Sequence, residues 1–139
     1  MPASKTESET VSGLLCAIEG LRILVPEANV DQVIEYPIVR SLPLAHRGVG
    51  GIALHADAVL ISLALSEKTG AQTKGVRLVT EGEARWVLEV STVSGFRTVT
   101  FTSKAPPKSV PPGWLRAAKD DNGNDVMVFD VRAVLKEFA

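Results

Sequence analysis

Few side chains in this sequence could carry acid–base or metal chemistry. His46 and His55 are its two histidines, and histidine is the side chain whose unperturbed pKa lies closest to neutrality. Together with Asp57, His55 could form an acid–base pair. A zinc site needs three or four His, Cys or carboxylate ligands at suitable spacing, and the sequence around the histidines does not supply them. We therefore predict no metal site and no cofactor, and we expect both histidines to lie in or beside loops.

Cys16 is the one cysteine of the chain and stands in the apolar segment GLLCAI. A nucleophilic thiol needs an accessible, electropositive setting and a base. A cysteine among apolar residues instead packs as a small hydrophobe with a raised pKa, and we predict core packing for Cys16. A single cysteine forms no internal disulfide, which fits a protein of the reducing cytoplasm.

A glycine-rich stretch, HRGVGG at residues 46–51, invites comparison with a phosphate-binding loop. It lacks the Lys-Ser/Thr pair and the spacing of such a loop, and it opens no βαβ unit. We predict a plain loop or tight turn. Carboxylate pairs such as Glu81 with Glu83 fall in predicted turns, where they are solvated, and Trp86 and Trp114 are expected to anchor the core. Because no catalytic set emerges, we predict that the protein is not an enzyme.

Composition points the same way. The chain has 139 residues, of which 45% are hydrophobic, 22% charged and 5% aromatic, and its formal net charge is −1. This length suits one domain with a core of its own. The near-neutral charge argues against a strongly basic nucleic-acid binder, and the apolar runs are shorter than the roughly 18 residues of a membrane-spanning helix.

Short strands must position these side chains. Residues 1–12 are polar and are predicted to form a disordered leader, which leaves residues 13–139 as a single domain. Residues 30–34 are too few to decide between helix and strand. Because Gly, Asn and Asp supply the backbone conformations of tight turns, we predict hairpins around Glu19-Gly20, near Ala56-Asp57, at residues 81–83 and around Asn122-Gly123.

The end of the chain follows a helical period. Val131, Val134, Leu135 and Phe138 are spaced at i, i+3, i+4 and i+7, and Asp130 is the expected N-cap. Many short strands with Gly and Pro turns, followed by one terminal helix, indicate an all-β barrel protein.

The order of these segments resembles a known family. GLLCAIEGLRILVPEANVDQVIE is a hairpin followed by Val-x-x-Val-Ile, and VRSLPLA then leads into GVGGIALHADAVLISLALS. RWVLEVSTVSGF and WLRAAKDDNGNDVMVFDVRAVL follow in the second half. This succession, over residues 13–138, resembles the CheW family of bacterial chemotaxis adaptors. The family pattern has the same hairpin, a Val-x-x-Val/Ile segment, a Leu-Pro linker, a Gly-Val-x-x-x-Arg-Gly loop and a closing hairpin.

The resemblance implies an all-β, CheW-like fold of two intertwined SH3-like, five-stranded β-barrels with a short C-terminal helix. It also implies a non-enzymatic adaptor in chemotaxis or motility signal transduction. Its partners would be the regulatory domain of a CheA-type histidine kinase and the cytoplasmic tip of methyl-accepting chemoreceptors, and other CheW-like domains are further candidates. The expected location is cytoplasmic, with no nucleic acid partner and no direct membrane insertion.

In the family, partner-binding residues fall in the Val-x-x-Val segment and in the Gly-Val-x-x-x-Arg-Gly loop. Matched by position, the resemblance implies partner binding by Val30, Gln32, Val33, Gly51, His55, Ala56 and Asp57. Ordinary core packing is an equal alternative for the two valines, and Gly51 could simply permit a turn.

The sequence departs from the family at two of these positions. Ala56-Asp57 stands where the family has Arg-Gly, so a cation is lost and an anion gained. Losing one partner of a desolvated charge pair typically costs about 2–5 kcal/mol, and an added charge also discriminates against the usual partner. We therefore expect a divergent adaptor with a dedicated receptor or kinase.

Two other interpretations stay open. An SH3-like or OB-like β-barrel could bind another protein or single-stranded nucleic acid, and the latter predicts a basic groove with stacking aromatics. An enzyme built on His55 and Asp57 would need a pocket and a histidine with a perturbed pKa.

Overall fold

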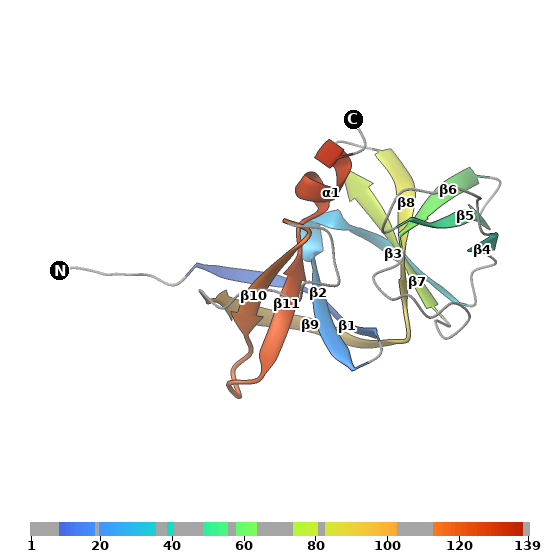
Figure 1. Cartoon of the computed structure of the whole chain (residues 1–139). Coiled ribbons are helices and arrows are strands. Elements are labelled where there is room, and N and C mark those ends of the chain that lie inside the picture. The colour runs from blue at the N-terminus through green and yellow to red at the C-terminus, as the bar shows by residue number, and fades with distance from the viewer. Residues whose placement is uncertain are drawn as a thin grey trace.

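The structure of the chain is a computed structural model that describes residues 9–18, 20–35, 39–40, 49–55, 58–63, 74–80, 83–102 and 113–137. These residues form two β-sheets, a short 3-10 turn η1 (Glu27–Asn29) and one short C-terminal helix, α1 (Val131–Glu137). The prediction of an all-β protein with a terminal helix is confirmed. In Figure 1 the two sheets lie side by side, with α1 packed above the junction between them.

The first sheet is a closed barrel made from both ends of the described chain. Its strands follow the order β1-β2-β11-β10-β9. Antiparallel hairpins supply most of the pairing, but β2 pairs in parallel with β11, which places Ile23 beside Met127 and Leu24 beside Val128. The strands are β1 (Thr10–Ile18), β2 (Leu21–Pro26), β9 (Thr92–Phe101), β10 (Leu115–Lys119) and β11 (Asp125–Phe129).

The second sheet is built from the middle of the chain, in the order β3-β7-β8-β6-β5-β4. It therefore has six strands where five were expected, because Val39 and Arg40 add a two-residue strand beside β5. A second parallel pairing joins β6 to β8. The strands are β3 (Val30–Glu35), β4 (Val39–Arg40), β5 (Val49–His55), β6 (Ala58–Leu63), β7 (Lys74–Thr80) and β8 (Glu83–Val90).

Two local predictions need correction, and one open alternative is decided by the structure. β1 begins at Thr10 and pairs with β9 from that residue, so the predicted leader is wrong for residues 10–12, whereas residues 1–8 lie outside the described residues. The predicted loop over residues 46–51 is wrong from Val49 onward, because β5 starts there. Residues 30–34, which the sequence left undecided, lie in strand β3.

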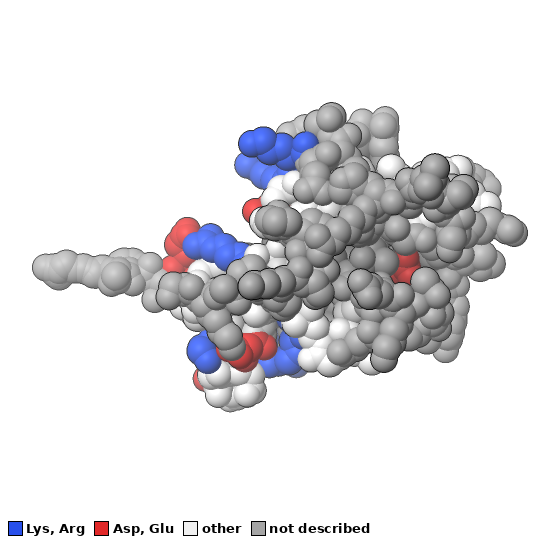
Figure 2. Space-filling view, viewed as in Figure 1, with Lys and Arg blue, Asp and Glu red and all other residues white. Residues whose placement is uncertain are grey.

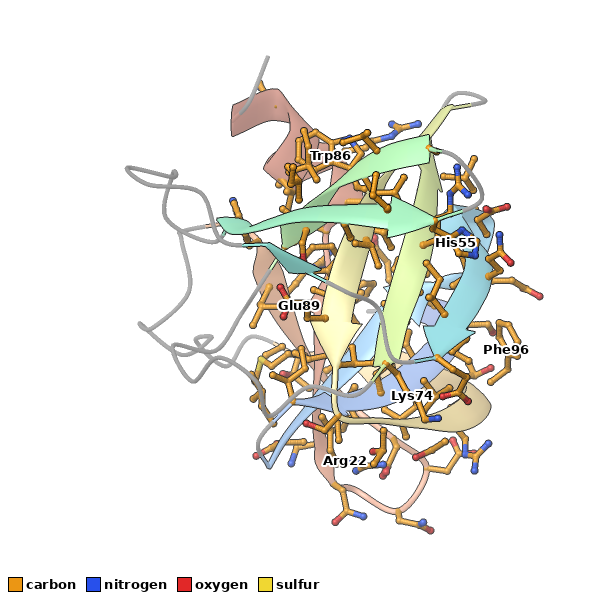
Figure 3. The ribbon with its side chains drawn as sticks, turned by 90° about the vertical axis from the view of Figure 1, so that its right-hand side faces the viewer. Arg22, His55, Lys74, Trp86, Glu89 and Phe96 are labelled. Atoms are coloured by element: carbon orange, nitrogen blue, oxygen red, sulfur yellow. The ribbon has the colours of Figure 1, made fainter. Side chains whose placement is uncertain are left out.

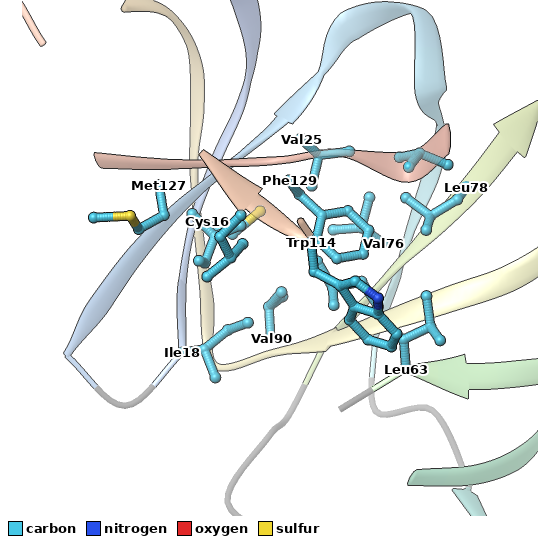
Figure 4. Close-up of a cluster of buried hydrophobic side chains, with 14 of the residues drawn as sticks. Cys16, Ile18, Val25, Leu63, Val76, Leu78, Val90, Trp114, Met127 and Phe129 are labelled. Carbon is cyan, nitrogen blue, oxygen red and sulfur yellow. The ribbon is translucent and has the colours of Figure 1, made fainter. Parts of the chain in front are cut away.

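Three hydrophobic clusters organise the interior. The first-barrel cluster contains Leu15, Leu24, Val99, Ala118, Val126 and Val128, and the second-sheet cluster contains Ile34, Ala53, Leu60 and Val87. The largest, which we call the central cluster, takes side chains from both sheets and from α1, and Figure 4 shows many of them. It includes Leu14, Cys16, Ile18, Ile23, Val25, Leu63, Val76, Leu78, Leu88, Val90, Trp114, Leu115, Ala117, Met127, Phe129, Val131 and Val134.

This arrangement explains why several strands are apolar without interruption. Successive residues of a strand face opposite sides of its sheet. In β1, Leu15 faces the first-barrel cluster, while its neighbours Leu14 and Cys16 face the central cluster. Each side of such a strand is therefore buried, and burying a Leu or Val side chain contributes about 1.5–3 kcal/mol.

The predicted core residues behave as expected. Cys16 is buried, and desolvation raises the pKa of its thiol to about 12. Trp114, directly before β10, is fully buried and meets Phe129 edge to face, with the ring centroids 6.5 Å apart. Trp86 is half-buried and packs against the central cluster.

Helix α1 begins as the sequence predicts. The backbone N–H of Ala133 donates to Asp130 Oδ1 at 3.0 Å, which is an N-cap interaction. Val131 and Val134 are buried in the central cluster. The side chain of Leu135 and the whole of Phe138 lie outside the described residues.

Candidate partner-binding surface

Strand β3 carries three of the residues matched to the partner-binding pattern. Val30 is half-buried against the central cluster, whereas Gln32 is exposed and Val33 is 39% exposed. A register shift between Val30 and Gln32 interrupts the pairing with β7, which is typical of a β-bulge. β3 is also the terminal strand of its sheet. Val30 therefore serves the core, and Gln32 and Val33 remain available to a partner.

The hairpin of β5 and β6 carries the next group. His55 ends β5 opposite Ala58 and is partly exposed. Ala56 and Asp57 lie outside the described residues, as does His46, so the pairing of His55 with Asp57 stays a prediction.

Gly51 does not belong to the same surface. It is buried opposite Ser62, four residues before His55 and so roughly 13 Å away along the strand. The register of β5 and β6 shifts between Val49 and Gly51, and Gly51 has a φ of 145°. The glycine thus permits a bulge within a strand, in keeping with the alternative that it serves backbone geometry.

Arg77 on β7 connects the end of β5 to β3. Its Nη1 lies 3.0 Å from His55 Nδ1, and its Nε lies 3.6 Å from Asp31 Oδ2. Guanidinium nitrogens only donate, so His55 Nδ1 accepts, and the proton of the neutral ring is on Nε2. The Arg77 side chain is 15% exposed. Figure 3 shows the result, with His55 beside β3 although β3 and β5 are far apart in the strand order.

The outer face of the same hairpin is apolar and accessible. Leu54 and Val59 are cross-strand partners, and they are 67% and 61% exposed. Ile52 and Ile61, the next pair on this face, are half-buried, and Ile61 lies beside Trp86 on β8. We call Ile52, Leu54, Val59, Ile61 and Trp86 the apolar strip. Exposed apolar surface of this kind marks an interaction site in many proteins.

The sequence alone does not reveal this strip. Residues 52–65 are apolar at both odd and even positions, which is typical of a strand with two buried faces. The structure shows that the face of Ala53 and Leu60 joins the second-sheet cluster, whereas the face of Leu54 and Val59 does not. Arg77 was also missed, because its partners come from strands that are distant in sequence.

Within the second sheet, a buried serine hydroxyl contacts the carboxylate of a partly buried glutamate. The Ser62 hydroxyl donates a short hydrogen bond to Glu89 Oε2. Desolvation raises the pKa of the Glu89 carboxyl, and the bond from Ser62 partly offsets this shift. Figure 3 shows Glu89 and His55 at well-separated positions of the second sheet, so the two do not form one site.

Two other kinds of feature, a metal site and a membrane-spanning helix, are not found among the described residues. Among those residues, no cluster of three or more His, Cys, Asp and Glu side chains could hold a metal ion. In the same part of the chain, no helix has both the length and the apolar character needed to cross a bilayer.

Comparison with known proteins gives a match in structure only. Neither the models of known families nor the curated proteins match the sequence. Among solved structures, the scaffolding protein TtCheW from Thermoanaerobacter tengcongensis is similar, with a TM-score of 0.65 and 11% identity. The match covers 88% of this chain and 90% of that chain. The chain therefore has the fold of a CheW scaffolding protein, two β-sheets that share a core, with a short C-terminal helix.

Proposed function

We propose that this protein is a non-enzymatic, CheW-like adaptor that couples chemoreceptors to a CheA-type histidine kinase in chemotaxis or motility signalling. The observation that supports it best is the CheW-like fold combined with an exposed surface on its second sheet. The second sheet carries the apolar strip on one face of the β5–β6 hairpin, and it carries the polar group of Asp31, Gln32, Arg77 and His55 on β3, β7 and the end of β5. An adaptor works through such surfaces and needs no catalytic group or cofactor. We place it in the cytoplasm, where its partners' signalling domains lie.

The apolar strip and β3 have the chemistry of a protein interface. Interfaces combine an apolar centre with a polar rim. Leu54 and Val59 supply exposed apolar side chains, and Gln32 and the Arg77 group supply polar side chains elsewhere on the same sheet. Val33 adds a further exposed apolar side chain. Binding by Ala56 and Asp57, which follow His55 in the sequence, is part of the proposal.

Replacement of the strip's exposed side chains tests the proposed function. The partners are the regulatory domain of a CheA-type kinase and a chemoreceptor tip from the same genome, titrated by calorimetry. We expect Leu54→Ser with Val59→Ser to weaken binding of at least one partner by about tenfold or more, because buried apolar anchors dominate interface energies.

Phe96→Ser is the matched control. Phe96 is 55% exposed on β9, which belongs to the first barrel, so its replacement removes a comparable apolar side chain elsewhere. Binding of neither partner by the unaltered protein would contradict the adaptor function. Equal losses for the double variant and for Phe96→Ser would contradict the assignment to the strip.

Partner choice is the second part of the proposal. We infer that Ala56-Asp57, in place of the family's Arg-Gly, selects a dedicated receptor or kinase. Ala56→Arg with Asp57→Gly should then weaken binding to the dedicated partner by about tenfold or more, since it reverses the local charge. Unchanged affinity in calorimetry would contradict this specificity mechanism and leave the adaptor function in place.

A further inference from the structure

A cleft opens at one end of the first barrel, away from the apolar strip. Its volume is ≈ 190 Å³. It lies where β1, β9 and β10 meet the start of α1, and η1 borders it. The lining includes Val11, Phe101, Arg116, Val128, Asp130 and Arg132.

The floor of the cleft is the open end of the barrel's own core. Val11 and Phe101 are only partly buried, and both pack against the first-barrel cluster, to which Val128 belongs. A ligand that enters the cleft therefore meets apolar side chains that are fixed by the barrel. This favours an apolar group as one part of the ligand.

Two guanidinium groups line the cleft. Arg116 comes from β10 and is 57% exposed; its Cζ lies 3.8 Å from the centroid of the Phe101 ring. Arg132 comes from α1 and is exposed. Figure 2 shows basic side chains above and to the left of a hollow between α1 and β10. Arginine binds carboxylates through two parallel hydrogen bonds, so the cleft favours a carboxylate as the other part of the ligand.

Two acidic side chains, Glu9 and Asp130, lie near these guanidinium groups. Glu9 Oε2 lies 3.7 Å from Arg116 Nη2, and both side chains are more than half exposed. Such exposed pairs are weak in water, and a ligand carboxylate can replace Glu9. The Asp130 carboxylate accepts the N-cap hydrogen bond of α1 and keeps its negative charge, so the two guanidinium groups of the lining exceed it by one positive charge. Of helix α1, we assign only the Arg132 side chain to ligand binding.

We propose that this cleft binds a short acidic segment of a partner protein, in which a glutamate or aspartate stands next to an apolar side chain. The volume lies below the roughly 300–1,000 Å³ typical of small-molecule and cofactor sites, but it admits a side chain or two. Single-stranded nucleic acid fits less well, because stacking needs an open aromatic face and Arg116 covers that of Phe101. The proposal goes beyond the adaptor function, since it concerns another surface and no particular pathway.

The test uses the full chain labelled with nitrogen-15 and two capped pentapeptides, Gly-Leu-Glu-Phe-Gly and the same peptide with Gln for Glu. We expect the Glu peptide to shift the amide signals of Val11, Phe101 and Val131 in a saturable manner. Because the glutamine peptide loses the charge-assisted hydrogen bonds, it should bind about tenfold more weakly.

Variants of the protein complete the test. Arg116→Gln and Arg132→Gln should each weaken binding of the Glu peptide by about tenfold. Lys136→Gln is the control, because it removes an equal charge from the same helix outside the cleft, and it should change affinity by less than about twofold. Amide spectra that overlay away from the cleft verify folding. If Arg116→Gln disturbs the barrel, Arg132→Gln alone provides the test, because the Arg132 side chain is exposed.

Several results would overturn the proposal. The first is the absence of shifts at the cleft with millimolar Glu peptide. Equal binding of the Glu and Gln peptides, or an equal loss for Lys136→Gln and Arg132→Gln, would reduce the effect to general electrostatics. Tighter binding of an oligothymidine to the same amides would assign the cleft to nucleic acid. None of these measurements involves the kinase, the receptor or the apolar strip, so failure here leaves the adaptor function untouched.

Discussion

At the scale of single residues, Arg77 links two parts of the candidate surface. Its guanidinium reaches Asp31 on β3 and His55 on β5 from a strand that neighbours only β3 and β8. Because its side chain is 15% exposed, these interactions are shielded from water more than those of a typical surface ion pair. Arg77 therefore adds side-chain contacts between β3 and the end of β5 to the backbone pairing of the sheet.

Replacing Arg77 measures how much its contacts with His55 and Asp31 contribute to stability. Arg77→Met keeps most of the apolar stem and removes the donors, so His55 and Asp31 lose a partner. We expect the free energy of unfolding to fall by about 1–3 kcal/mol in urea titrations. Lys119→Met is the control, since the Lys119–Asp125 pair is 3.2 Å long and about half exposed, and it should cost no more than about 1 kcal/mol. Equal costs would show that Arg77 acts as an ordinary surface charge.

Glu89 predicts how stability changes with pH. Burial raises the pKa of its carboxyl in the folded protein. At a pH between the ordinary carboxyl pKa of about 4.3 and this raised pKa, the unfolded state therefore binds fewer protons than the folded state. Stability contributed by this group is therefore complete at low pH and is lost as pH rises through the folded pKa.

Glu89→Gln removes this ionisation and can still accept the hydrogen bond from Ser62. We expect the variant to be more stable than the unaltered protein at pH 7, and the difference to disappear near pH 4. The urea midpoints at the two pH values test this, with Glu27→Gln, an exposed glutamate, as the control. A gain of the same size at both pH values would contradict the assignment.

At the scale of elements, the sequence predicts local structure well and non-local pairing poorly. The hairpins around Gly20 and Asn122-Gly123 follow from turn chemistry between adjacent residues. The parallel pairings of β2 with β11 and of β6 with β8 join distant segments, so no local pattern encodes them. The same reason explains why the candidate site was predicted only in part. Gln32, Val33 and His55 came from motif positions, but Arg77 and the apolar strip depend on which strands become neighbours.

The close approach of β1 and β2 gives a prediction for these elements. A Cβ atom on Gly13 would lie 2.1 Å from the carbonyl oxygen of Val25, so backbone would have to move. We expect Gly13→Ala to destabilise the protein by about 3 kcal/mol or more. Gly123→Ala is the matched change in an open turn, with a φ of 80° and no neighbour within 4 Å, and it should cost about 1–2 kcal/mol. Thermal melts of both variants provide the measurement, and similar losses would show that the contact relaxes freely.

At the scale of the whole molecule, the central cluster joins the two sheets. Val76, Leu78 and Leu88 from the second sheet pack with Ile23, Val25 and Phe129 from the first barrel. This cluster is larger than the interior of either sheet alone. Each half therefore depends on the other for much of its buried apolar area.

We expect the two halves to unfold as one unit. Urea titration followed by far-ultraviolet circular dichroism and by tryptophan fluorescence should give coincident single transitions. Val76→Ala should lower both midpoints together, by an amount that corresponds to about 1–3 kcal/mol. Two separated transitions, or a shift in only one signal, would show that the halves are independently stable.

The pairing of β2 with β11 also has a consequence for how the protein is made. The second sheet uses the continuous stretch from residue 30 to residue 90, whereas the first barrel needs residues 10–26 together with residues 92–129. Closure over so long a loop is slow, and hydrogen-exchange pulse labelling should find β6–β8 protected before β2–β11. During synthesis the β1–β2 hairpin emerges before the strands β9, β10 and β11 that complete its barrel, and it carries apolar side chains on both faces. Until the β10–β11 hairpin has been made, these apolar faces lack their barrel partners, and we expect a chaperone to bind them.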